Sequence, residues 1–166
     1  THNKGSLLEM KIFESRQILQ TGALVVAATV LALGLSGCTA TVNLETAPLA
    51  NDPACAEITV RLPDVIGDQA KRSTNAQATG AWGNPSSVIL RCGLPQVEVS
   101  TLPCVTASGV DWLVDEAKAP SYRFITFGRN PATEVIVDSK VISGAAVLDA
   151  LALAIKQAPA SKRCSS

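Results

Sequence analysis

Histidine is almost missing from this chain of 166 residues, which holds a single copy, His2. Methionine is as scarce, with Met10 as its one copy, and aromatic residues make up only 4% of the sequence. Beyond Met10 the chain therefore has no imidazole and no thioether. This excludes a Ser-His-Asp triad, a Cys-His pair and metal sites that use His or Met from that part of the chain. Any core must be built mostly from Val, Leu, Ile and Ala.

An excess of charge of either sign is missing as well. Fourteen Lys and Arg residues balance 14 Asp and Glu residues, and charged residues make up 17% of the chain. Such a sequence lacks the basic excess that is typical of nucleic-acid-binding proteins, so we expect no nucleic acid partner. Neither G-x-x-x-x-G-K-[ST] nor G-x-G-x-x-G occurs, which argues against a glycine-rich phosphate loop. The length allows one domain and a targeting segment.

The first part of the chain has the pattern of a secretory signal. Two cations follow Met10, an uncharged run covers Thr21–Leu35, and small residues precede Cys38. As a helix, this run of about 15 residues would span roughly 22 Å, short of the roughly 30 Å of a bilayer core. We therefore predict a lipoprotein signal peptide over residues 10–37, with residues 1–9 as an upstream extension.

The tetrapeptide at the end of this segment, Leu35-Ser36-Gly37-Cys38, resembles the lipobox of bacterial lipoproteins. In a lipobox the Cys thiol receives a diacylglyceryl group, and a peptidase cuts just before it. Two acyl chains hold a protein far better than one, because each buried methylene contributes about 0.8 kcal/mol. The alternative is an ordinary cleaved signal, with Cys38 lost or incidental. We expect a lipid anchor on Cys38, on the extracytoplasmic face of the cell membrane.

The rest of the chain divides into three parts. Residues 38–52 are small and polar without periodicity, and we predict a flexible tether that spans roughly 20 Å on average. Residues 53–160 are expected to form a single domain. Residues 161–166 would be a short C-terminal tail.

Alternating or short apolar runs predict strands in the domain. A Gly-Arg-Asn-Pro turn between the last two runs indicates a hairpin. The polar stretch 64–80 is expected to be a long surface loop, and 144–158 has helical spacing with Ser143 as a candidate N-cap. We therefore predict an α+β fold, with a small antiparallel-rich sheet and a C-terminal helix packed on one face. The predicted strands are 58–62, 87–92, 97–99, 110–114, 122–127 and 134–138.

Four cysteines remain once Cys38 is set aside. An even number outside the cytosol predicts two disulfides, for which three pairings are possible. We favour Cys92–Cys104, which closes a loop that contains Gly and Pro, and Cys55–Cys164, which joins the two ends of the domain. The alternative, a four-Cys zinc site, lacks any C-x-x-C pair and would need reduced thiols in an oxidising compartment. We expect neither a metal nor another cofactor.

Arginine and tryptophan supply candidate ligand-binding residues, chiefly Trp82, Arg91 and Arg129. The guanidinium group is a planar fork for carboxylate or phosphate, and the indole ring is a stacking surface. Together they would suit an anionic or sugar-like envelope ligand. The simpler interpretation is that the tryptophans belong to the core and the arginines pair with nearby acids. The wider set also contains Arg72, Arg123 and Trp112.

The carboxylates of the chain suggest an alternative, enzymatic function. Paired carboxylates can hydrolyse a glycosidic bond, so a small hydrolase acting on cell-wall glycan is the second hypothesis. The simpler interpretation is that these acids are solvated residues on strand ends and loops, and we assign no catalytic residue. The acids concerned are Asp64, Asp68, Asp111, Asp115 and Glu116.

Four short blocks occur in an order that resembles a family of actinobacterial exported proteins, the domain of unknown function 3515, over residues 55–155. This resemblance implies a high-GC Gram-positive host and supports the anchor and the disulfides. It implies no known activity. We therefore expect a non-enzymatic lipoprotein that binds or scaffolds an envelope protein or wall component. The blocks are Trp82-Gly83-Asn84-Pro85, Leu90-Arg91-Cys92-Gly93, Asp111-Trp112-Leu113 and Arg129-Asn130-Pro131.

The lipobox generates a first testable prediction. Intact mass spectrometry of the membrane fraction should find a mature chain that begins at a diacylglyceryl-modified Cys38. The Cys38→Ser variant should leave the signal peptide uncut, because the peptidase requires the lipidated thiol. A mature N-terminus at any other residue would contradict the assignment.

Overall fold

The computed structural model describes residues 40–164. The predicted extension over 1–9, the signal peptide over 10–37 and Cys38 lie outside the described residues. Neither helix in the described range is long and apolar enough to cross a membrane.

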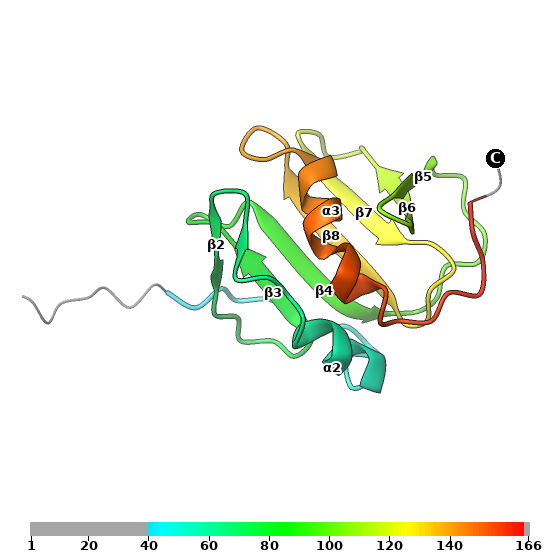
Figure 1. Ribbon diagram of the computed structural model, residues 1–166. Helices are drawn as coiled ribbons and strands as arrows, with labels where there is room; N and C mark the ends of the chain where they lie inside the picture. Colours follow the sequence, from blue (N-terminus) through cyan, green and yellow to red (C-terminus); the bar gives the residue numbers. More distant parts are fainter. Residues whose placement is uncertain (1–39, 165–166) are drawn as a thin grey trace, which may run out of the picture. The chain divides into compact units, whose positions relative to one another are not determined.

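Eight strands of residues 40–164 form one sheet, in the order β1-β2-β3-β4-β8-β7-β6-β5 (Figure 1). Neighbouring strands all pair antiparallel. Two four-stranded meanders, β1–β4 and β5–β8, therefore start at opposite edges and meet where β4 pairs with β8. The strands are β1 (Val65–Ile66), β2 (Gln69–Arg72), β3 (Thr79–Trp82), β4 (Val88–Leu94), β5 (Cys104–Ala107), β6 (Val110–Asp115), β7 (Ser121–Thr126) and β8 (Ala132–Asp138).

Two helices, α2 (Pro53–Thr59) and α3 (Gly144–Ile155), lie on the same face of this sheet (Figure 1). The apolar side of α3 is fully buried and packs with alternate residues of the central strands, as helical spacing requires. This confirms the predicted α+β fold with a C-terminal helix on one face. Ser143 is the N-cap residue of α3, although its side chain makes no capping hydrogen bond. The core includes Val88, Leu90, Trp112, Val135, Val137, Leu151 and Ile155.

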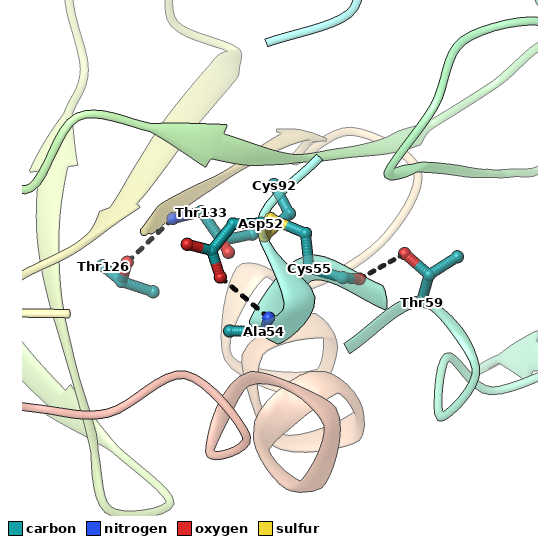
Figure 2. The surroundings of a disulfide bond; sticks show 7 residues. All are labelled: Asp52, Ala54, Cys55, Thr59, Cys92, Thr126 and Thr133. Atoms are coloured by element: carbon teal, nitrogen blue, oxygen red, sulfur yellow. Dashed lines mark hydrogen bonds between the residues drawn. A yellow bond between two sulfur atoms is a disulfide. The ribbon is translucent and has the colours of Figure 1, made fainter. Parts of the chain in front are cut away.

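The predicted strand over 58–62 is wrong, because most of it belongs to helix α2 and the turn that ends it. Asp52 caps this helix by accepting a hydrogen bond from the Ala54 amide at 2.8 Å, and Pro53 occupies the first turn, where its missing N–H costs nothing (Figure 2). Ile58 is buried in α2, and Val60, the exposed C-cap residue, follows the helix, so the alternation of Ile58, Val60 and Leu62 does not mark a strand.

Two further predictions on the chain between the strands are wrong. The expected surface loop 64–80 contains β1, β2 and the start of β3, which pair through backbone hydrogen bonds at one end of the sheet. The expected strand at 97–99 is part of the connection from β4 to β5. The strands predicted around 87–92, 110–114, 122–127 and 134–138 are confirmed, and 87–92 becomes the central strand β4.

The predicted flexible tether is wrong for residues 40–52, which lie against the domain. The Val42 amide donates to the Ser73 carbonyl at 2.9 Å, and the Leu44 amide donates to Asn75 Oδ1 at 2.8 Å. Further along, the Leu49 amide donates to the Gly93 carbonyl at 2.8 Å. These bonds satisfy backbone groups that a solvated coil would leave to water, so the folded unit begins at Ala40 rather than near residue 53.

The predicted number of disulfides is confirmed, but the predicted pairing is wrong. The bonds are Cys55–Cys92 and Cys104–Cys164. Cys92 points to the helix-covered face of β4, where it meets the first turns of α2 (Figure 2). Cys104 lies at the start of edge strand β5 and holds the C-terminal segment. Because all four thiols are consumed in these bonds, a four-Cys zinc site is ruled out.

The C-terminal segment 161–164 is part of the domain as well, rather than a free tail. The Ser161 amide donates to the Gly128 carbonyl at 2.8 Å, and the disulfide to β5 follows three residues later. By loop-closure entropy each disulfide contributes roughly 4 kcal/mol to the free energy of unfolding, since the two close loops of similar length. A small core with few aromatic residues therefore gains much of its stability from two crosslinks.

Gly93 should tolerate no side chain. Its φ is +111°, and a Cβ there would lie 2.6 Å from the Leu49 carbonyl carbon and 2.7 Å from Ala50 Cα, both backbone atoms. Gly93→Ala should lower the free energy of unfolding by roughly 3 kcal/mol in urea titrations.

Gly109→Ala is the matched control for this prediction. Gly109 also has a positive φ, +74°, but its new Cβ would meet only the flexible Lys156 side chain, at 3.4 Å. This variant should lose about 1 kcal/mol. Equal losses in the two variants would contradict the close backbone approach at Gly93.

Candidate functional site

The sheet face opposite the helices carries the candidate site, and we call it the open face. Side chains alternate along a strand, so the residues between the core positions of β4, β8 and β7 point away from α3. On β4 and β8 these are Ile89, Arg91, Glu134 and Ile136, and on β7 the corresponding residue is Arg123.

Only part of the open face is covered. The end of β4 and its connection to β5 pack Leu94, Val97 and Leu102 onto Leu113 and Ile125, which form a small second core. This cover ends before Arg91 and Arg123. The polar part of the open face therefore faces solvent.

A buried carboxylate organises this polar part. The side chain of Glu134 is only 5% exposed, yet each of its oxygens accepts from an arginine. Oε1 lies 2.6 Å from Arg91 Nε and 2.5 Å from Arg91 Nη2, and Oε2 lies 2.5 Å from Arg123 Nε. The two contacts through Nε are charge-assisted hydrogen bonds, which are shorter and stronger than neutral ones.

The strand register explains why two arginines reach one glutamate. Arg91 lies directly opposite Glu134 in the β4–β8 pair. Across β8, Glu134 is opposite Ile125 while Arg123 is opposite Ile136, so Arg123 is the diagonal neighbour of Glu134. Opposite and diagonal positions on one face are both within reach of long side chains.

Two adjacent pockets flank this cluster and share Arg91, Glu134 and Ile136. One has a volume of about 470 Å³ and the other about 400 Å³. We call the two together the arginine groove. The first pocket is completed by Asp115, Lys118, Ser121 and Arg123, and the second by Asn43, Leu44, Glu45 and Ile89.

The donors that the groove presents are of a kind that can bind an anion. Glu134 engages Arg91 through Nε and Nη2 and Arg123 through Nε, which holds both guanidinium groups in place. Among residues 40–164, Arg91 Nη1 and both terminal nitrogens of Arg123 have no hydrogen-bond acceptor. Donors fixed in this way can bind a carboxylate or phosphate at little further cost in side-chain entropy.

Trp82 and Arg129, two of the three ligand-binding residues predicted from the sequence, lie elsewhere. Trp82 has no exposed surface, and its indole Nε1 donates to the Pro63 carbonyl at 2.9 Å. It is a core residue without a stacking surface for a ligand. Of the predicted three, the structure places only Arg91 in the groove, where Arg123 of the wider set joins it.

Arg129 serves the C-terminal segment. It is 8% exposed and donates to the Ala158 carbonyl. Burial, and then repulsion from Arg163, lower the pKa of Arg129, while nearby Asp111 raises it. Asp111 is itself buried and accepts from Thr106 Oγ1 at 2.6 Å and from the Cys164 amide at 3.0 Å. These contacts are structural.

The carboxylates considered for hydrolysis are dispersed. Asp111 holds the C-terminal segment, Asp115 lines the arginine groove, and Glu116 lines a different, apolar pocket beside α3. Asp64 and Asp68 lie near β1, at the other edge of the sheet. In the first pocket of the arginine groove, the carboxylate beside Asp115 is Glu134, whose oxygens are both taken by arginines.

Glu134 and Ile136 were not identified from the sequence as residues of the candidate site. A charged residue inside the run Ala-Thr-Glu-Val-Ile-Val is the signal that could have found Glu134, because a buried glutamate is almost always paired. Nothing in the sequence states that its partners are 43 and 11 residues away.

The fold and the site define a disulfide-stabilised α+β domain with an arginine groove on the open face of its sheet. The chain belongs to the family described as protein of unknown function (DUF3515), whose model matches residues 18–164. A search of the curated proteins and a search of the solved structures returned no significant match.

Glu134→Gln tests the organising role of the carboxylate. The amide has the same shape but presents a donor to one of the two guanidinium groups. We therefore expect the free energy of unfolding to fall by about 2 kcal/mol. Urea titration of the purified domain measures this.

The control is Glu57→Gln, which alters the exposed ion pair between Glu57 of α2 and Arg61 in the turn that follows, whose N···O distance is also 2.5 Å. Exposed pairs contribute about 0–1 kcal/mol, so this variant should unfold almost as the wild type does. A Glu134→Gln variant as stable as Glu57→Gln would show that Glu134 does not organise the groove.

Proposed function

We propose that this protein is a lipid-anchored, non-enzymatic module on the outer face of the cell membrane, where its arginine groove binds an anionic group of another envelope component. The observation that carries the binding role is the pair of guanidinium groups held by buried Glu134 beside two pockets. Carboxylate and phosphate both fit these donors.

Two further observations support the setting. Both disulfides lie inside the folded domain, and disulfides persist in oxidising compartments rather than in the cytosol. The lipobox-like sequence at Cys38 supplies the anchor, two residues before the folded unit begins. Export and anchoring explain both features together.

The apolar residues of the groove narrow the ligand further. Ile89 and Ile136 are partly exposed beside the arginines, so the groove combines fixed cations with an apolar floor. A ligand with a carboxylate or phosphate next to an apolar portion would match both. A bare polyanion would use only the arginines.

Titration of the soluble mature chain tests this function. The chain from residue 38 with Cys38→Ser retains the whole compact unit and both disulfides. Sodium phosphate and sodium succinate should each shift the methyl resonances of Ile89 and Ile136 in NMR spectra. Arg123→Gln should weaken binding about tenfold or more, because a charge-assisted hydrogen bond contributes about 1.5–3 kcal/mol.

Arg61→Gln removes an exposed arginine in the turn after α2 and is the control, which should bind as the wild type does. Arg91 still neutralises Glu134 in Arg123→Gln, so the variant domain should remain folded. Shifts scattered over the whole surface, or equal affinity in Arg123→Gln, would overturn the groove as the anion site.

A further inference from the structure

The folded unit begins almost at the proposed anchor. Arg72 Nη2 donates to the Ala40 carbonyl at 2.5 Å. The Val42 amide donates to the carbonyl of Ser73, the residue directly after β2. In the sequence, Thr39 alone separates Ala40 from Cys38. Two residues of extended chain reach at most about 7 Å, so an anchor on Cys38 leaves no flexible spacer between lipid and domain.

The same segment forms one wall of the arginine groove. Asn43, Leu44 and Glu45 line the pocket that also contains Arg91 and Glu134. Asn43 follows Ala40 by three residues, which span at most about 11 Å. The groove therefore opens close to the point at which the chain would leave the bilayer.

We propose that the arginine groove faces the bilayer that holds the anchor and binds the phosphate of its lipid headgroups. This inference rests on the proposed function, since it needs both the anchor and the anion site. The free Nη atoms of Arg91 and Arg123 bind the phosphate oxygens. Lys118, exposed at the rim of the groove, adds a third cation.

The charge of the groove decides how this binding works. Three cations, Arg91, Arg123 and Lys118, face three acids, Asp115, Glu134 and Glu45, so the groove has no net charge to attract a bilayer from a distance. Binding depends instead on direct contact between the guanidinium groups and a phosphate. Such a site is weak on its own.

The anchor compensates for that weakness. Tethering to the same bilayer turns headgroup binding into an intramolecular event, with an effective concentration in the millimolar range for a short linker. The short linker also restricts how far the domain can rotate away. The short link to the anchor and the weak phosphate site together hold the domain in one orientation, in which α2 and α3 face away from the bilayer.

Nanodiscs test this orientation. The lipidated mature protein is purified from membranes and placed in phosphatidylcholine nanodiscs that contain a few per cent of a lipid with a nitroxide on its headgroup. The methyl resonances of Ile89 and Ile136 should lose most of their intensity. The methyls of Leu153, which is 77% exposed on α3, should keep theirs and serve as the internal control.

Two comparisons separate binding from mere proximity. Arg123→Gln should restore at least half of the lost Ile89 and Ile136 intensity, whereas Arg61→Gln should restore none. Free inorganic phosphate at high concentration should act like Arg123→Gln, because it competes for the same donors.

Each other result overturns the inference. Equal loss at Leu153, no loss in the groove, or a loss that Arg123→Gln leaves unchanged would each contradict headgroup binding. Another outcome is that soluble phosphate shifts the methyl resonances of Ile89 and Ile136 in the unlipidated chain while the nanodisc leaves their intensities unchanged. That result would support the anion site and contradict binding of lipid headgroups. If neither experiment affects the groove, the proposed function fails with it.

Discussion

The pairing of β4 with β8 is the interaction on which the rest of the structure depends. It joins two meanders that are otherwise built from neighbours in the sequence, along a register that runs from Val88 opposite Val137 to Leu94 opposite Ala132. Each other strand pair is formed within one meander. Within residues 40–164 this is the strand pair that joins the two meanders, and its formation places both halves of the core under α3. Without it, neither the core nor the groove exists.

Strand β4 contributes residues of the core and of the groove to the two faces of the sheet. Along β4, Leu90 and Cys92 enter the core, Arg91 points to the open face, and Gly93 lets the backbone of residues 49–50 approach closely. The four residues of this block therefore support the core, the groove, a disulfide and the docking of the N-terminal segment. A change at each of them would act on a different part of the molecule.

Local rules predicted the elements whose patterns are local. The hairpin of β7 and β8 follows from a Gly-Arg-Asn-Pro turn, and α3 follows from its apolar spacing. The same rules failed at 58–62, because an alternation over only five residues is too short to distinguish a strand from the end of a helix. The capping pair Asp52-Pro53 was the better signal there. They failed again at β1, which has only two residues, and at β2, whose residues are mostly polar, because such short strands are formed by backbone pairing and carry no apolar alternation.

By itself, the sequence determined the class of fold, the presence of two disulfides, the lack of imidazole beyond Met10 and the choice of Arg91 as a candidate ligand residue. Tertiary structure decided everything that depends on which distant residues meet. Cys92 pairs with Cys55 rather than Cys104 because alternation turns it toward α2. Trp82 lies in the core, whereas Arg123 lies in the groove. Composition and spacing describe each strand separately, but a disulfide or a shared carboxylate is defined by the register between strands, which only the packed sheet specifies.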